Sequence, residues 1–408
     1  MKNLGVRFSL YINYFVFAIL LNSVGIVILK SQNNYGVDEV EASALEAFKD
    51  LPIAFVSFFV ASFLPRIGYK KGMLIGLGLV TVACIAMYFG NSFNTAKLLF
   101  ATVGVSFALI KVSVYSMIGM VTENKKEHNS MMSSIEGVFM IGIALAYFIF
   151  PAFTNESNPD SWLNVYWLLA GLTTVSFFFL LGTRFDATPE APGTGILDDF
   201  LQMWQLLTRI LIIVFIISAF LFVMIEQGIM SWLPTFNDRV LNLPENVSVR
   251  MASILAISLA LGRLMAGQLT KKISWLWVLT ICTLISMLLV RFILPQTTGL
   301  EVKEINSITD IPLIGFAFPV VGLFIAPIYP LLNSVVLSAL PKKQHSPMTG
   351  LIVVSSALGG TLGSRAIGWL FKTKGPENAF YYTLIPMGVL LISYFILKKL
   401  TDKDAVQA

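Results

Sequence analysis

The stretch Gly104-Val-Ser-Phe-Ala-Leu-Ile-Lys111 begins with glycine, continues through apolar residues and ends on a charge. A related stretch, Gly322-Leu-Phe-Ile-Ala-Pro-Ile-Tyr329, lies 218 positions later and shares the glycine, the alanine and the last isoleucine. The polar loops that follow correspond as well, with His128 and His345 in similar places. Matching segments at a near-constant separation indicate an internal repeat. The sequence therefore predicts two halves of similar fold.

Long apolar runs occupy almost the whole chain. A membrane-spanning helix needs about 20 mostly apolar residues. Twelve runs meet this requirement, near residues 9–29, 45–64, 73–90, 96–120, 130–152, 162–182, 208–234, 249–269, 275–294, 312–339, 347–371 and 379–398. We therefore expect an all-α membrane protein of two six-helix bundles. Residues 1–184 form the first bundle, residues 185–207 a cytoplasmic linker rich in Pro and Gly, and residues 208–408 the second bundle.

The composition agrees with a membrane protein and excludes other classes. Apolar types make up 56% of the residues and charged types 12%, against about 45–50% and about 25% in soluble domains. A disordered chain, a nucleic-acid-binding domain and a secreted disulfide scaffold are thereby excluded. The two cysteines, Cys84 and Cys282, lie in apolar runs and are expected to be buried free thiols. Without a Cys/His cluster or a phosphate-binding loop, we expect no metal, no cofactor and no enzyme activity.

The distribution of Lys and Arg predicts the orientation in the membrane. Loops that face the cytoplasm carry an excess of these residues. If the N-terminus is inside, the cytoplasmic segments hold 15 Lys and Arg, and the outer segments hold 8. We therefore expect a multi-pass protein of the plasma (inner) membrane with both termini in the cytoplasm.

Two basic loops carry a resemblance to a known family. Ala61-Ser-Phe-Leu-Pro-Arg-Ile-Gly-Tyr-Lys-Lys71 follows the second expected span, and Gly262-Arg-Leu-Met-Ala-Gly-Gln-Leu-Thr-Lys-Lys272 has the matching place in the second half. With the spans, the linker and the repeat, these loops resemble the major facilitator superfamily over essentially the whole chain. The resemblance implies a transporter that works by alternating access. Ala61 stands where that family usually has Gly, and Pro65 where it has Asp, so no Asp-based charge relay is implied at the first loop.

A narrower resemblance concerns the solute. Phe222-Val-Met-Ile-Glu-Gln-Gly-Ile-Met-Ser-Trp232 is similar to the seventh span of the fucose-galactose-glucose:proton symporters, and residues 322–330 and 355–363 are similar to their tenth and eleventh spans. This resemblance implies a sugar carried with protons. At two positions where that group has an acidic residue, this chain has another residue. Asn22 stands at the position in the first span and Lys111 at the position in the fourth.

Polar residues inside the spans are the candidates for binding the solute. An ionisable side chain in hydrocarbon costs at least about 2.5–3.5 kcal/mol, so each needs a reason. The superfamily resemblance implies that spans one, four, seven and ten line the cavity. The substrate-binding candidates are Asn22, Lys111, Gln227, Trp232, Tyr329, Asn333 and Arg365. Structural alternatives remain open: Gln227 could pack against another helix, Trp232 could lie in the interfacial belt, and Arg365 could close an outer gate.

Three carboxylates are the candidates for proton coupling. A buried carboxylate that lacks a partner takes up a proton near neutral pH, which suits a proton carrier. Glu226 is the first candidate, because it lies deep in span seven, and Glu136 and Asp50 are the others. Glu136 lies at a depth similar to that of Lys111, so a direct ion pair is expected. Asp50 belongs to a Glu46, Lys49, Asp50 group with helical spacing, which a solvated outer gate would also explain.

The sequence is compatible with three functions. The first is a transporter of a small polar solute, a sugar first, coupled to protons. The second has the same fold but carries a carboxylate, an amino acid or a short peptide, with Lys111 and Arg365 as the anion site. The third is a membrane receptor or scaffold, which predicts a sizeable extra domain. We expect a monomer in the bilayer that binds a small-molecule substrate and no nucleic acid.

Overall fold

The fold is described here from a computed structural model of the chain. It describes residues 4–407 apart from 123–124, 156, 184–200, 202, 271, 298–310, 312 and 342–343. Most of the expected linker, 185–207, lies outside the described residues. The described residues are nearly all helical, and their only extended pairing is an isolated bridge between Asn155 and Asn158. The expectation of an all-α protein is confirmed.

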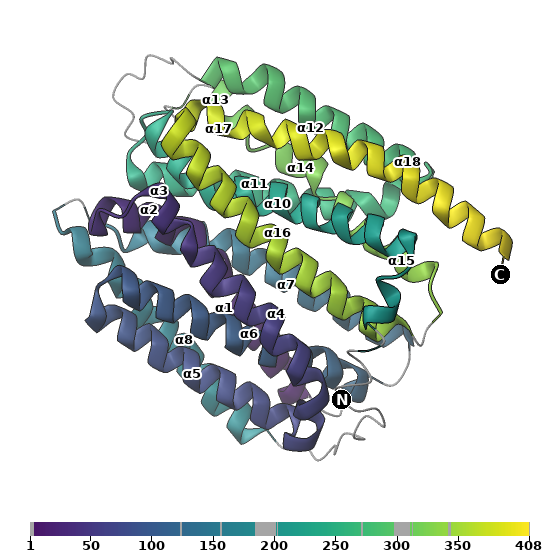
Figure 1. The fold of residues 1–408 in the computed structure, drawn as a ribbon. Helices are drawn as coiled ribbons and strands as arrows, with labels where there is room; N and C mark the ends of the chain where they lie inside the picture. The colour runs from purple at the N-terminus through teal and green to yellow at the C-terminus, as the bar shows by residue number, and fades with distance from the viewer. Residues whose placement is uncertain are drawn as a thin grey trace. The chain divides into compact units, whose positions relative to one another are not determined.

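Contacts divide the chain into two compact units (Figure 1). Unit 1 comprises residues 1–37 and 45–196, and unit 2 comprises residues 38–44 and 197–408. The helices of unit 1 are α1 (Leu4–Asn22), α2 (Val24–Tyr35), α4 (Ala44–Ile67), α5 (Tyr69–Gly90), α6 (Phe93–Val121), α7 (Lys125–Ala152), η1 (Pro159–Asn164) and α8 (Val165–Gly182). Those of unit 2 are α3 (Glu39–Ala42), α10 (Ile210–Arg239), α11 (Glu245–Leu269), α12 (Trp275–Thr297), α13 (Leu313–Ala317), α14 (Val321–Ile325), α15 (Ile328–Ser338), α16 (His345–Lys374), α17 (Pro376–Ala379), η4 (Phe380–Thr383) and α18 (Leu384–Gln407).

The helices coincide with the expected spans. Among the described residues, eleven segments are long and apolar enough to cross a membrane. α4 covers the remaining expected span, 45–64, and is 24 residues long. The tenth span is divided into α13, α14 and α15. Its interruptions contain Pro319 and Pro327, which cannot donate a main-chain hydrogen bond to the helix.

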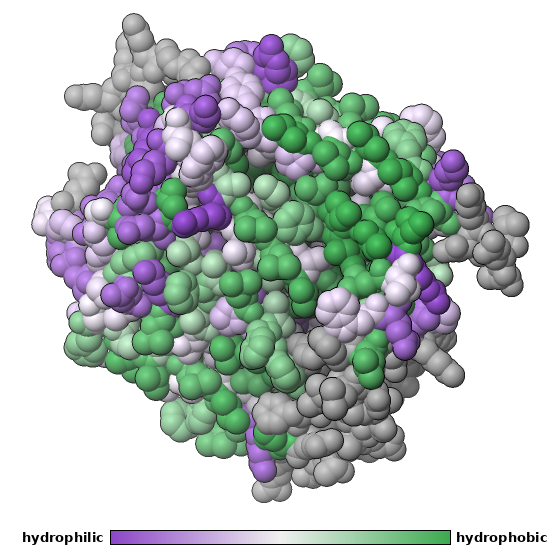
Figure 2. All heavy atoms as spheres, viewed as in Figure 1, coloured by the Kyte–Doolittle hydropathy of each residue, from purple (hydrophilic) through white to green (hydrophobic). Residues whose placement is uncertain are grey.

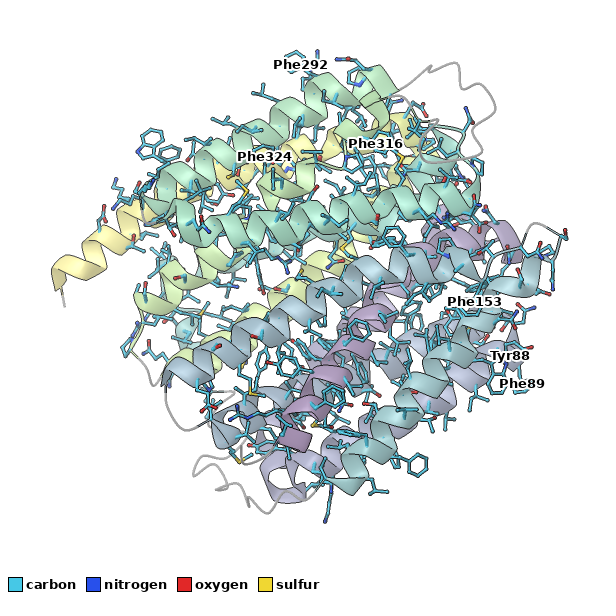
Figure 3. The ribbon with its side chains drawn as sticks, turned by 180° about the vertical axis from the view of Figure 1, so that it is seen from behind. Tyr88, Phe89, Phe153, Phe292, Phe316 and Phe324 are labelled. Carbon is cyan, nitrogen blue, oxygen red and sulfur yellow. The ribbon has the colours of Figure 1, made fainter. Side chains whose placement is uncertain are left out.

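Large apolar side chains cover the outside of the helices. Phe89 at the end of α5 is 70% exposed and Phe292 on α12 is 59% exposed. Figure 3 shows Phe292 pointing away from α12, and Tyr88 and Phe89 standing at the end of α5. Figure 2 shows hydrophobic side chains over much of the visible face. A soluble protein would not expose such a surface, whereas a lipid bilayer would cover it.

The basic loop after α4 has a structural role within unit 1. Gly68 begins the turn into α5 with φ +99°, a conformation that a residue with a Cβ rarely adopts. The turn brings Lys70 to the end of α8, where its Nζ donates to the main-chain oxygens of Leu181 (3.0 Å) and Thr183 (2.6 Å). A cation at a helix C-terminus satisfies the last carbonyls and stabilises the helix dipole. The loop therefore joins α8 to the α4–α5 hairpin.

The glycines of the repeated stretches make equivalent contacts in the two units. A Cβ on Gly104 of α6 would lie 2.3 Å from the main-chain oxygen of Lys49 on α4. A Cβ on Gly322 of α14 would lie 2.9 Å from the main-chain oxygen of Leu255 on α11. In each unit, the fourth span thus meets the backbone of the second span through a residue without a side chain. The sequence repeat corresponds to a repeated helix contact.

Candidate functional site

The principal polar group of unit 2 is an ion pair between α10 and α11. The Nη2 atom of Arg263 donates to Oε1 of Glu226 at 3.0 Å. The Glu226 side chain is 8% exposed and that of Arg263 is 35% exposed. The expectation that Glu226 lacks a partner is therefore wrong, because helix packing brings Arg263 to it from 37 positions along the chain.

Hydroxyl and amide groups lie on α15 and α16 of the same unit. The hydroxyls of Tyr329 and Ser356 are 3.0 Å apart, and the Tyr329 ring stacks on Phe222 of α10 with centroids 5.6 Å apart. Asn333 follows Tyr329 by about one helical turn. Among the described residues, its Oδ1 atom is buried without a hydrogen-bond partner. A buried amide oxygen of this kind normally needs a donor, which a bound hydroxyl can supply.

The polar group of unit 1 is built around Glu136 on α7. The hydroxyl of Tyr14 donates to Glu136 Oε1 at 3.2 Å, and the hydroxyl of Tyr115 donates to the same oxygen. The two hydroxyls are 3.1 Å apart. Lys111 Nζ lies over the rings of Phe107 and Tyr115, at 5.8 and 5.9 Å from their centroids. Lys111 and Glu136 are thus linked through Tyr115, and the expected direct ion pair is not among those of the described residues.

Removing the Tyr115 hydroxyl tests this arrangement. Tyr115→Phe leaves one tyrosine donor on a partly buried carboxylate, and we expect a loss of about 1–2 kcal/mol. The apparent unfolding temperature should fall by roughly 2–8 °C. Tyr88→Phe is the matched control, because the Tyr88 ring packs on Phe89 and Trp167 at the end of α5. Equal unfolding temperatures for the two variants, measured in the same detergent, would contradict the role of Tyr115.

A buried charged trio lies at the start of α4. Lys49 Nζ donates to Glu46 and lies 3.4 Å from Oδ1 of Asp50. The side chains of Glu46, Lys49 and Asp50 are 0%, 6% and 13% exposed. The spacing expected from the sequence brings the three together, but burial replaces the solvated gate that was the alternative. One ammonium therefore serves two carboxylates here.

The other candidate residues have different surroundings. Asn22 donates to the main-chain oxygen of Ala18 in its own helix, at 2.9 Å. Gln227 is half-buried on α10, next to Glu226. Trp232 is fully buried, and its Nε1 donates to Ser364 Oγ at 3.0 Å. It therefore presents no open face to a sugar and does not lie in an interfacial belt.

Arg365 binds the main chain of the segment before α4. Its Nη1 atom donates to the main-chain oxygen of Val40 and lies 3.5 Å from Ser43 Oγ. Cys84 and Cys282 are free, as expected. In the described part of the chain, no group of three or more His, Cys, Asp or Glu side chains could hold a metal ion.

Three residues of these groups were missed by the sequence reasoning. Tyr14, Tyr115 and Arg263 were not among the candidate residues. A signal did exist for Tyr115, since it follows Lys111 by four positions and shares its helix face. The partners of Glu136 and Glu226 come from other helices, and the sequence spacing does not contain that information.

A family model and a known protein both match most of the chain. The family model described as Major Facilitator Superfamily matches residues 8–302. The chain is 20% identical over 409 residues to Protein TsgA homolog of Buchnera aphidicola subsp. Baizongia pistaciae (strain Bp), covering 99% of this chain and 98% of that protein.

Solved structures share the fold along nearly the whole chain. A bacterial homolog of the human lysosomal transporter Spinster, inward-facing and unoccupied, matches with a TM-score of 0.80 and 13% identity over 98% of this chain and 97% of that chain. The E. coli fucose:proton symporter FucP matches with a TM-score of 0.64 and 12% identity over 97% and 99%. At these identities the likeness concerns the fold alone.

Proposed function

Because this chain belongs to the Major Facilitator Superfamily, we propose that it is a secondary transporter that moves a small neutral polar solute, a sugar first, together with protons. It is a multi-pass membrane protein of that superfamily, with apolar helices long enough to cross a bilayer. The observation that carries the choice of solute is the hydroxyl and amide group of Tyr329, Ser356 and Asn333. These side chains offer neutral donors and acceptors, which match sugar hydroxyls.

The charges of unit 2 also support a neutral solute. Glu226 and Arg263 neutralise each other beside the hydroxyl group. Arg365, which the alternative hypothesis assigns to an anionic solute, binds the main chain at Val40. The alternative of a carboxylate, an amino acid or a short peptide then depends on Lys111. The fucose:proton symporter shares the fold, which makes fucose a natural first solute to test.

For the proton, we place Asp50 ahead of Glu226 and Glu136. Glu226 is engaged in an ion pair with Arg263, which protonation of the carboxylate would weaken. Glu136 already accepts hydrogen bonds from two tyrosine hydroxyls, so its carboxylate is engaged within unit 1. Asp50 shares an ammonium that Glu46 also uses, so its protonation leaves an intact pair behind. Asp50 can therefore change its charge with the smallest disruption.

The test is uptake into proteoliposomes with and without an inside-alkaline pH gradient. The solutes are L-fucose, D-glucose, uridine, L-alanine and succinate, each radiolabelled. We expect a sugar to be concentrated under the gradient and only equilibrated without it. Uptake of succinate or alanine alone would support the carboxylate alternative. A gradient that never raises uptake above equilibrium would reject proton coupling.

The variant Asp50→Asn separates transport from coupling. It keeps the size of the side chain but cannot bind and release a proton. We expect Asp50→Asn to exchange the accepted solute at near the unaltered rate and to lose gradient-driven accumulation at least 10-fold. Glu377→Gln is the control, because Glu377 lies in the short helix α17 outside this trio. Accumulation by Asp50→Asn at the unaltered level would exclude Asp50 as the carrier.

A further inference from the structure

A short segment of unit 2 is far in sequence from the rest of that unit. Residues 38–44 belong to unit 2, although the residues before and after them, up to Val37 and from Leu45, belong to unit 1. The segment contains the one-turn helix α3, which begins at Asp38, where the side chain accepts from the amide of Glu41. We call residues 38–43 the strap.

Cations of α10 and α16 hold the strap. Lys372 Nζ donates to Asp38 Oδ2 at 2.7 Å, and Arg239 forms an ion pair with Glu39. The hydrogen bond from Lys372 lowers the pKa of Asp38, so this carboxylate stays charged at neutral pH. Arg365 adds a main-chain contact, because its guanidinium binds the oxygen of Val40.

The surface of α16 under the strap is shaped to receive it. Ser364, Gly368 and Lys372 follow one another at intervals of four residues and share one face of α16. A Cβ on Gly368 would lie 2.7 Å from the main-chain oxygen of Glu39 and 2.6 Å from the Trp232 ring. Only a glycine lets the strap backbone approach this closely. Trp232, fixed by Ser364, forms the floor of the contact.

The strength of this attachment is limited. The Lys372–Asp38 side chains are 50% and 38% exposed, and those of Arg239 and Glu39 are 35% and 16% exposed. Exposed ion pairs contribute little individually and weaken with salt. The strap buries few large side chains, since Ala42 is its buried apolar residue. Such an attachment can open and close without unfolding the helices around it.

We propose that residues 38–43 form a detachable strap, which Arg239, Arg365 and Lys372 hold on unit 2 by charge and by a main-chain hydrogen bond. Its use in a transport cycle rests on the proposed function. Detachment of the strap can be measured without any solute. Failure of the transport function therefore does not decide whether the strap detaches, and failure of the strap proposal does not decide the transport function.

A single cysteine in the strap reports its detachment. Ser43 is 1% exposed and lies at the end of α3, so a cysteine there reacts with a maleimide only when the strap is released. The experiment uses full-length Ser43→Cys in nanodiscs, in a background with Cys84→Ala and Cys282→Ala. Both faces of a nanodisc are accessible, so the result does not depend on the orientation in the membrane. The probe is N-ethylmaleimide, and the rate of modification is followed by mass spectrometry.

The charges of the strap should control this rate. We expect Asp38→Asn with Glu39→Gln to raise the labelling rate of Ser43→Cys about 5- to 20-fold, and Arg365→Gln to raise it comparably. Raising the salt from 20 to 500 mM should speed labelling in the unaltered strap and have little effect in the neutral one. Exchanging the charges of one pair, Glu39→Arg with Arg239→Glu, should return the rate toward the original.

A cysteine in place of exposed Glu41 is the control, and it should react at a similar rate in all backgrounds. Size-exclusion chromatography shows whether each variant stays folded. Slow labelling of Ser43→Cys in every charge variant and at every salt concentration would show that the strap is a fixed part of unit 2. Labelling of the unaltered strap as fast as the Glu41→Cys control would show that the strap is not held. Either result overturns the proposal.

Discussion

Replacing Gly363 by leucine is expected to remove most of the correctly folded protein, because it disrupts the helix packing of unit 2. A Cβ at this position of α16 would lie 2.3 Å from the main-chain oxygen of Met224 on α10, and only 2.8 Å from its Cα. One turn earlier, a Cβ on Gly359 would lie 2.5 Å from the main-chain oxygen of Phe220. The two helices therefore touch backbone to backbone. A leucine would force them apart along this contact, and strain from overpacking a tight contact typically costs about 1–3 kcal/mol or more.

The measurement is the yield of monodisperse protein by fluorescence-detected size exclusion. We expect Gly363→Leu to lose most of this yield and Gly363→Ala to show an intermediate loss. Gly388→Leu is the matched control, since a Cβ on Gly388 of α18 would meet no atom within 4 Å. A normal yield and unfolding temperature for Gly363→Leu would mean that α10 and α16 do not approach as described.

Removing Arg263 alone is expected to do more harm than removing it together with Glu226. Arg263→Met leaves the Glu226 carboxylate, 8% exposed, without its ion-pair partner. Breaking a buried pair costs about 3–5 kcal/mol, and the 35% exposure of Arg263 reduces this to about 2 kcal/mol. For a unit of this size, we expect the apparent unfolding temperature to fall by roughly 4–8 °C.

The double variant isolates the interaction. Arg263→Met with Glu226→Gln removes both charges, and we expect it to recover at least half of the lost stability. Glu226→Gln alone should be milder than Arg263→Met, because the exposed part of Arg263 can be hydrated. If the double variant is as unstable as the sum of the two single ones, the pair makes no net contribution and Glu226 returns as the leading proton carrier.

The twelve expected spans could be predicted from the sequence because the hydrocarbon core of a bilayer imposes a simple requirement. Each segment of about 20 residues has to be apolar and internally hydrogen-bonded, and this appears directly as long runs of apolar letters. The internal repeat could be recognised in the sequence for a related reason. Gly104 and Gly322 both stand where two backbones meet, so both halves keep a residue without a side chain at this contact.

The interaction partners of the charged residues could not all be predicted from the sequence in this way. Within one helix, the spacing of Glu46, Lys49 and Asp50 correctly predicted their contact, because helical neighbours are fixed by local geometry. Between helices, Glu226 was expected to be alone and Glu136 was expected to bind Lys111. In the structure, Glu226 forms an ion pair with Arg263, and Glu136 accepts hydrogen bonds from tyrosine hydroxyls.

The sequence by itself thus determined the membrane class, the all-α fold, the superfamily resemblance and the set of polar residues within the spans. Only the tertiary structure decided which of these residues touch: it buried Trp232 under the strap and set Arg365 on the strap backbone. The physical reason is that hydrophobicity and helical spacing are local properties of a chain. Helix rotation and depth, which choose one partner among several polar residues, are set by packing between distant segments.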